Sequence, residues 1–266
     1  MDPITIFGLI VGGSIARGIA RKSISIFQRK NSSDQKQKTI QKNNNTYQYT
    51  PPQTATFTNI DCQNFTNYGV NYFYHMTHHT NITSIFNYGL LSHKKASHDF
   101  INKKDISNQN VQEIRNSKKI VCGDNTYDIR LHDCVPFYFN PRNAMLYSRK
   151  EMQRDIIFLG VNTSVFAKTT SFFTDGNAAS ADTLFYYQTK DLDKLPWDVL
   201  KSSRWNNKID GRRKMCSEVL IKDQVEVDYI STIICNNEII RQKIIGKIPF
   251  AFRHHVKVVV DHSFYF

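Results

Sequence analysis

The chain has 266 residues, of which 40% are hydrophobic and 12% aromatic, enough to form one sizeable domain or two small ones. This composition excludes a chain that is disordered throughout. The 35 Lys and Arg residues outnumber the 23 Asp and Glu residues, and the net charge of +12 favours a polyanionic partner such as nucleic acid or an anionic membrane face.

The cysteines point to a reducing compartment. They are odd in number and far apart, and none forms a C-x-x-C pair, which argues against a secreted disulfide framework. We therefore expect a cytoplasmic protein, with peripheral membrane attachment as a further option. The five residues are Cys62, Cys122, Cys134, Cys216 and Cys235.

An apolar stretch, residues 4–20, is followed by a basic run. It contains Arg17 and is short for a membrane span, and its positive residues follow it, unlike those of a secretory signal. We predict a helix within residues 1–30 that lies on a membrane or associates with itself; a helix that packs on the domain is the alternative. Small residues at four-residue spacing would permit close helix contact. They are Gly8, Gly12, Ala16 and Ala20.

Residues 31–58 are rich in Asn, Gln, Lys, Ser and Thr. Few of these side chains can offset the entropy lost on ordering, so we predict a flexible polar linker over residues 31–64. Residues 1–60 hold eight Lys or Arg and two acidic residues, so half of the net +12 lies outside the folded domain, which we place at residues 65–266.

The domain is predicted to begin with a strand that leads into a short helix. Residues 72–77, YFYHMT, are dense in β-forming residues. Residues 80–89 carry apolar side chains at helical spacing, a capping residue at Thr80 or Asn81, and Gly89 where the helix should end.

Three histidines, His75, His78 and His79, lie in this region. No cysteine or carboxylate stands at a recognisable ligand spacing, so we expect hydrogen-bonding histidines and no metal. Residues 93–118 are polar and rich in lysine, and predict a helical or loop insertion with a solvated face; contact with nucleic acid is the alternative.

Residues 135–147, VPFYFNPRNAMLY, combine an aromatic strand, an Asn-Pro turn and an apolar run that can begin a helix. Arg142 is the single charge, placed between Tyr138 and Tyr147. A guanidinium held on a turn suits an anion such as pyrophosphate, because its donors can bind two oxygens at once. An ordinary surface arginine is the alternative.

Glu218 begins a predicted buried strand, directly after a loop that contains a basic run. A carboxylate at a strand edge can stabilise developing positive charge or accept a proton; a solvated glutamate is the alternative. The other predicted features are a strand at 156–161, a turn at Asp175–Gly176, a tryptophan-containing segment at 195–205, and strands at 229–235 and 256–260.

Five stretches, in this order, resemble the DarT-type ADP-ribosyltransferases, toxins that attach ADP-ribose from NAD to bases in single-stranded DNA. The similarity covers roughly residues 70–235, and the ordered set is more specific than any one part. The stretches are YHMTHHTNITSIFNYGLL (74–91), VPFYFNPRNAMLY (135–147), TDGNAAS (174–180), LPWD (195–198) and SEVLI (217–221).

The resemblance implies an α+β ADP-ribosyltransferase fold with a split, mostly antiparallel β-sheet core around a cleft for NAD, the co-substrate, and no metal. It implies that Glu218 is the catalytic glutamate and that Arg142 holds NAD and supports catalysis. A carboxylate can stabilise the oxocarbenium-like centre formed when the bond between nicotinamide and ribose breaks.

Other roles follow from the same resemblance. His75 and Thr77 would face the nicotinamide end of NAD, and Asn81 would border the cleft. The further residues expected beside the cofactor are Tyr138 and Tyr147. Those expected to contact nucleic acid are Arg212, Arg213 and Lys214, with Trp205 as a base-stacking candidate.

We therefore predict an NAD-dependent ADP-ribosyltransferase, a toxin or anti-phage effector, that modifies a base in single-stranded DNA and releases nicotinamide. Its partner would be a neutralising antitoxin, such as a macrodomain ADP-ribosyl hydrolase. The alternatives are a transferase that acts on RNA or protein, or an inactive module that binds nucleic acid or a membrane.

Overall fold

The computed structural model describes residues 59–99 and 101–266. The predicted N-terminal helix and residues 31–58 of the predicted linker lie outside this part of the chain. The first described helix, α1 (Asn59–Asn67), crosses the domain boundary that we placed at residue 65.

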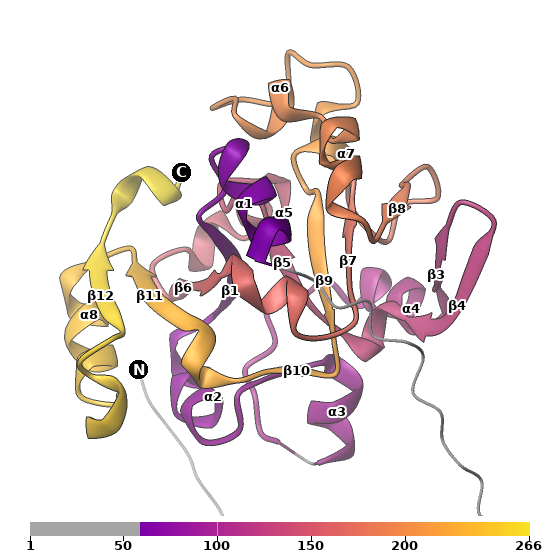
Figure 1. The fold of residues 1–266 in the computed structure, drawn as a ribbon. Coiled ribbons are helices and arrows are strands. Elements are labelled where there is room, and N and C mark those ends of the chain that lie inside the picture. The colour runs from indigo at the N-terminus through magenta and orange to yellow at the C-terminus, as the bar shows by residue number, and fades with distance from the viewer. Residues whose placement is uncertain (1–58, 100) are drawn as a thin grey trace, which may run out of the picture. The chain divides into compact units, whose positions relative to one another are not determined.

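The fold combines short helices with one large sheet (Figure 1). The other helices are α2 (Ile82–Tyr88), α3 (His93–His98), α4 (Gln109–Ser117), α5 (Ala144–Tyr147), α6 (Trp197–Leu200), α7 (Gly211–Lys214) and α8 (Glu238–Ile245). The strands are β1 (Tyr72–His78), β2 (Leu90–Leu91), β3 (Lys119–Cys122), β4 (Asn125–Arg130), β5 (Cys134–Tyr138), β6 (Ile156–Asn162), β7 (Ser171–Thr174), β8 (Phe185–Tyr186), β9 (Glu218–Lys222), β10 (Gln224–Val225), β11 (Ile230–Cys235) and β12 (Lys257–Val260).

The main sheet has eight strands in the order β12-β11-β6-β1-β5-β9-β7-β8. All neighbouring pairs are antiparallel except β11 and β12. β1 pairs with β6 along its whole length but meets β5 only where Tyr74 lies opposite Tyr138. The sheet therefore divides between β1 and β5, which confirms the predicted α+β class with a split, mostly antiparallel core.

Hydrophobic residues cover both faces of the central strands. Ile156 to Val161 of β6 are all buried, which explains why this strand reads as a continuous apolar run. On one face, the rings of Phe65 and Phe73 meet edge to face, with centroids 5.0 Å apart, and attach α1 to β1. On the other face, Tyr265 Oη donates to the Ile156 carbonyl (3.1 Å).

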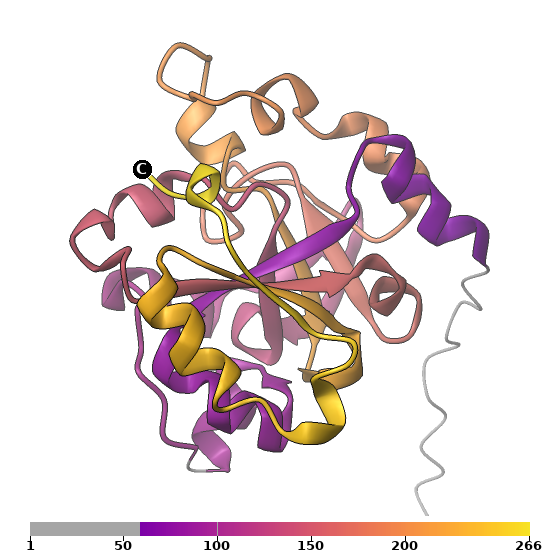
Figure 2. The same cartoon turned by 90° about the vertical axis from the view of Figure 1, so that its left-hand side faces the viewer.

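The peripheral elements lie at the two ends of the sheet. Figure 2 shows α8 beside β11 and β12, which it contacts. The β3–β4 hairpin pairs only with itself among the described strands and contacts β8 at the other end. None of the helices within residues 59–99 and 101–266 is long and apolar enough to cross a membrane.

The predicted strands at 72–77 and 156–161 are confirmed as β1 and β6. The helix predicted within residues 80–89 is α2, and Gly89 ends it with a φ of 79°. The predicted insertion at 93–118 contains α3 and α4. Its face is not wholly solvated, because Arg115 is only 7% exposed.

Gly89→Ala should destabilise the domain by about 2–4 kcal/mol, since φ and ψ at this residue suit glycine and a Cβ would lie 2.6 Å from the Val225 carbonyl oxygen. Gly69→Ala is the matched control: Gly69 also has a φ of 79°, but nothing lies within 4 Å of its Cβ position. We expect a loss of about 1 kcal/mol there. Urea unfolding of both variants tests this, and equal losses would contradict it.

Candidate active site

A cavity of about 700 Å³ opens where the sheet divides. Its walls come from β1, α4, β5 and β9, and from the loops around residues 104 and 178. The structure thus brings together most of the residues predicted from the sequence. Those that line the cavity are His75, Thr77, Asn81, Tyr138, Arg212, Arg213 and Glu218.

Glu218 is the first residue of β9 and only 1% exposed. Arg115 Nη1 donates to its Oε2 (3.0 Å) and more weakly to its Oε1 (3.3 Å). The backbone N–H of Ala178 donates to Oε1 at 2.9 Å. Burial of a lone carboxylate would be costly, so these donors explain how an ionised glutamate can sit at the cavity wall.

Arg115 completes this pair from α4. Burial alone would lower its pKa, but the adjacent carboxylate of Glu218 raises the pKa of Arg115 above its ordinary value, so the guanidinium stays charged. Its Nη2 is buried without a hydrogen-bond partner among the described residues, and Arg115 lines the cavity. One donor is therefore available to a bound molecule.

Tyr138 lies next to Glu218 across β5 and β9 and opposite Tyr74 of β1. Its pairing with Tyr74 is the one register pair between β1 and β5 among the described residues, and it lies where the two halves of the sheet meet. Burial raises the pKa of Tyr138 well above its ordinary value, and the charge of Glu218 adds to the effect. The phenol therefore stays protonated and can donate a hydrogen bond.

His75 joins the two halves from β1, because its Nδ1 lies 2.9 Å from the Pro136 carbonyl oxygen. A carbonyl only accepts, so Nδ1 carries the proton and Nε2 is an acceptor. Burial lowers the pKa of His75 and keeps the ring neutral. Asn81 Nδ2 donates to Thr77 Oγ1 (2.9 Å) and to the Lys104 carbonyl (2.9 Å).

Asn81 thus has a different local role from the one predicted. It occupies the cap position of α2, but no side-chain capping bond is formed. Its side chain instead fixes the segment at Lys104, whose N–H donates to Asn81 Oδ1 (2.7 Å). That segment forms one wall of the cavity.

Arg213 is held by protein groups. It donates to Asp175 (2.9 Å), Asp210 (2.6 Å) and Thr183 (3.1 Å), and its side chain is 13% exposed. Its carbonyl also accepts from the Asn177 N–H (3.0 Å), directly before the residue that donates to Glu218. Arg213 therefore anchors the 175–183 loop and is paired with acidic side chains, whereas the sequence predicts that it contacts nucleic acid.

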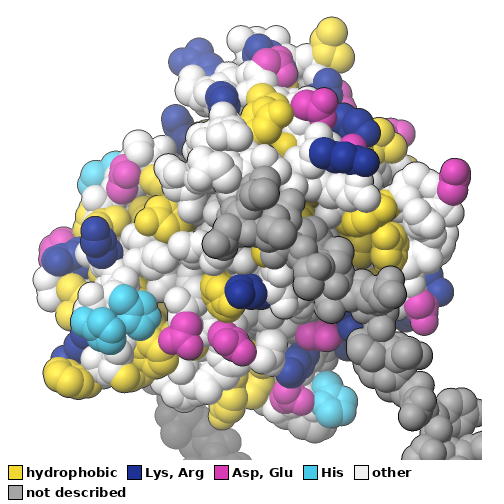
Figure 3. Space-filling view, viewed as in Figure 1, with side chains coloured by type: hydrophobic (Ala, Val, Ile, Leu, Met, Phe, Trp, Pro, Cys, Tyr) yellow, Lys and Arg dark blue, Asp and Glu magenta, His cyan; other side chains and the backbone are white. Residues whose placement is uncertain are grey.

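Arg212 is exposed at the cavity, whereas Lys214 is not among the described lining residues of this cavity or its neighbour. Figure 3 shows basic side chains on the surface over α6 and α7. This surface is where the sequence predicts contact with nucleic acid.

Arg142, Tyr147 and Trp205 line a second cavity, of about 500 Å³. Arg142 is therefore not the arginine that contacts Glu218, and its predicted role in holding NAD stays a prediction. Arg115 was not predicted from the sequence, because it lies in the polar, lysine-rich segment 93–118, for which a solvated face is expected. It is identified only by its bond to Glu218 of β9, a contact between residues 103 positions apart in the chain.

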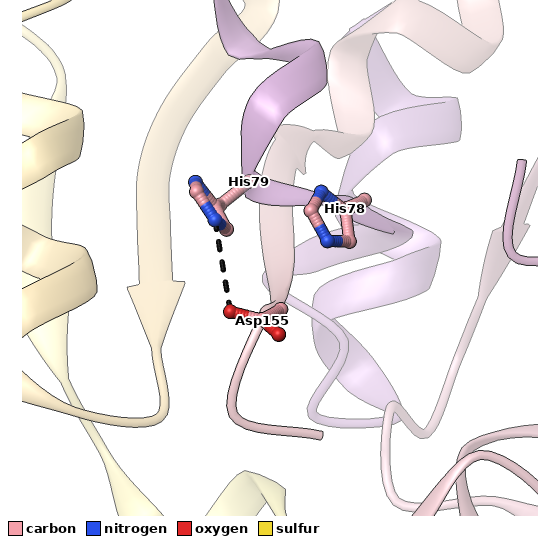
Figure 4. A group of neighbouring side chains, drawn as sticks. All are labelled: His78, His79 and Asp155. Atoms are coloured by element: carbon pink, nitrogen blue, oxygen red, sulfur yellow. Dashed lines mark ion pairs between the residues drawn. The ribbon is translucent and has the colours of Figure 1, made fainter. Parts of the chain in front are cut away.

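His78, His79 and Asp155 lie at the end of β1, and their possible ligand atoms are all within 4.8 Å of one another (Figure 4). His79 Nε2 lies 3.7 Å from Asp155 Oδ1. Burial, followed by the charge of His78, lowers the pKa of His79. The group offers three donors, one fewer than a closed zinc site requires, and does not include His75.

The family model described as "ssDNA thymidine ADP-ribosyltransferase, DarT" matches residues 74–266. A Thermosipho africanus DNA ADP-ribosyl transferase–DNA ADP-ribosyl glycohydrolase fusion protein is 28% identical over 199 residues, which cover 73% of this chain. This chain spans 49% of the length of that fusion protein.

Two solved structures from Thermus sp. 2.9 have a similar fold. DarT in complex with ADP-ribosylated ssDNA superposes with a TM-score of 0.67 and 24% identity, over 74% of this chain and 97% of that chain. DarT in complex with NAD⁺ gives a TM-score of 0.61 and 25% identity, over 74% and 98%.

Arg115→Met should lower the free energy of unfolding by about 3–5 kcal/mol, because it leaves the Glu218 carboxylate buried and unpaired. Adding Glu218→Gln should restore much of the loss, since the uncompensated charge is then removed. Urea unfolding of the two single variants and the double variant measures this coupling. Losses in the double variant equal to the sum of the two single losses would contradict a direct buried pair. Lys208→Met, which breaks an exposed pair with Asp198, is the control and should change the free energy of unfolding little.

Proposed function

The chain belongs to the DarT family of single-stranded DNA thymidine ADP-ribosyltransferases, and we propose that the Glu218–Arg115 pair is the centre at which it transfers ADP-ribose from NAD. The protein is accordingly an NAD-dependent enzyme, with NAD as co-substrate. One observation carries the proposal: a carboxylate, held by Arg115 and the Ala178 N–H, lines the large cavity of the split sheet.

Glu218 stabilises the positive charge that develops on the ribose as nicotinamide leaves. Its two hydrogen-bonded oxygens are fixed before substrate arrives, so little reorganisation opposes the reaction. Arg115 keeps the carboxylate oriented, and its free Nη2 can donate to the substrate.

NAD lies in the same cavity, with its nicotinamide end toward β1. His75 offers Nε2 as an acceptor for the nicotinamide amide group, and Thr77 and Asn81 form the adjoining wall. Tyr138 offers a protonated phenol next to Glu218. The Thermus relative solved in complex with NAD⁺ supports NAD as the co-substrate of this fold.

The acceptor is a thymine base of single-stranded DNA, supported by the family description and by the Thermus structure with ADP-ribosylated ssDNA. Glu218 is buried, so a base can reach it only after it has left the base stack. The free energy needed to unstack and unpair a base is lowest in a single strand. Arg212, exposed at the cavity, is placed to contact the DNA backbone.

A DNA ADP-ribosyl glycohydrolase is the partner that we propose, as the antitoxin of this toxin. The support is the Thermosipho relative in which a transferase and a glycohydrolase are fused in one chain. A separate or fused hydrolase would remove the same mark.

Glu218→Gln should reduce transfer to an ssDNA oligonucleotide by about a thousandfold or more while NAD still binds, because the amide keeps the shape and loses the charge. Transfer is measured with labelled NAD, and NAD affinity by calorimetry. Near-normal transfer by this variant would contradict the proposal.

Arg115→Lys should lower kcat by at least tenfold, because an ammonium that bonds to Glu218 leaves no second nitrogen in the place of Nη2, which is open to a bound molecule. Arg142→Lys is the comparison: Arg142 lines the other cavity, so kcat at saturating DNA should stay within about threefold of the wild-type value. A larger loss of kcat in Arg142→Lys than in Arg115→Lys would contradict this and would favour Arg142 as the catalytic arginine, as the sequence predicted.

A further inference from the structure

The second cavity is an aromatic recess beside the active site. Three of its lining residues, Tyr147, Trp205 and Phe266, carry rings that meet pairwise at nearly right angles: 79° for Tyr147 and Trp205, 86° for Tyr147 and Phe266, and 87° for Trp205 and Phe266. Tyr147 is 52% exposed and Phe266 is 43% exposed. Large aromatic side chains gathered at a cavity and left this open mark a surface that binds a flat ligand.

The charge of this recess is positive. Arg142 lies over the Phe266 ring, with its guanidinium carbon 4.6 Å from the ring centroid, and Arg204 is exposed at the rim. Arg142 Nε is buried and has no hydrogen-bond partner among the described residues. No acidic side chain stands among the described residues that line the recess. Rings for stacking with two arginines fit a nucleobase and its phosphate, and disfavour a cationic ligand.

The recess adjoins the active-site cavity through two segments of the chain. Arg142 and Tyr147 flank Ala144 and Met145, which line the large cavity. Trp205 precedes the turn at Asp210, which also lines it. The two segments meet at Tyr147 and Trp205, whose ring centroids are 5.8 Å apart.

We propose that this recess binds a nucleotide of the same DNA strand next to the thymidine that receives ADP-ribose, with its base stacked on Trp205 or Tyr147 and its phosphate held by Arg204 and Arg142. This inference rests on the proposed function. The adenosine half of NAD has the same chemistry as a DNA nucleotide, but the 700 Å³ cavity that contains Glu218 is large enough for NAD by itself. The recess is therefore assigned to the DNA.

Tryptophan fluorescence tests occupancy directly, because the chain has two tryptophans. Trp197 stacks on Tyr68 and donates to the Leu192 carbonyl, away from the recess. In a full-length Trp197→Phe variant, Trp205 is the single reporter. Titration with a short oligo(dT) should quench its emission with saturation, whereas NAD alone should not; quenching by NAD alone would overturn the assignment.

Steady-state kinetics test the same point with Trp197 intact. Trp205→Ala should raise the KM for an ssDNA oligonucleotide about tenfold, consistent with the loss of one stacked base, and leave the KM for NAD unchanged. Arg204→Ala should weaken DNA use and reduce the slope of its salt dependence by about one phosphate contact. Lys201→Ala, which removes a charge on the same segment outside the recess, is the control and should leave both KM values unchanged.

The outcomes separate this inference from the proposed function. If wild-type protein transfers ADP-ribose to ssDNA but the Trp205 and Arg204 variants keep wild-type KM values for DNA, the recess is not a nucleotide site and the proposed function stands. If their KM for NAD rises instead, the recess holds the adenosine half of NAD. If wild-type protein transfers no ADP-ribose to ssDNA, the proposed function is wrong, and the inference that rests on it is wrong as well.

Discussion

The ion pair between Glu218 and Arg115 is the interaction on which the rest of the site depends. Both groups are almost fully buried, and burying either charge without the other would strongly destabilise the fold. The pair joins a helix of the segment before β3 to the first residue of β9, so the cavity and the reactive carboxylate form only when the two regions pack. Such a pair specifies geometry at a cost in stability, which is typical of functional sites.

The surrounding loops orient this pair. Arg213 fixes the 175–183 loop through Asp175 and Thr183, and the loop gives Glu218 its backbone donor at Ala178. Lys118, directly after α4, donates to the Ser180 carbonyl of the same loop at 2.5 Å. The loop is therefore tied both to the basic turn before β9 and to the helix that carries Arg115.

Much of the fold was predictable because its local signals agree with its tertiary structure. The aromatic strand β1, the continuous apolar run of β6 and the glycine that ends α2 each satisfy a local rule. The position of Glu218 at the start of a buried strand was also predicted. By contrast, no local pattern distinguishes Arg115 from the lysines around it, or Arg213 from the free cations beside it. Their partners lie far away in the sequence, and only packing reveals which charge is neutralised.

The central claim is tested most directly by incubating the full chain with NAD and an ssDNA oligonucleotide that contains a single thymine, and measuring the oligonucleotide by mass spectrometry. The account predicts that the mass rises by one ADP-ribose unit with equimolar release of nicotinamide, and that neither a thymine-free oligonucleotide nor the Glu218→Gln variant shows this. NAD consumption that labels RNA or protein instead, or an unmodified oligonucleotide with no loss of NAD, would contradict it.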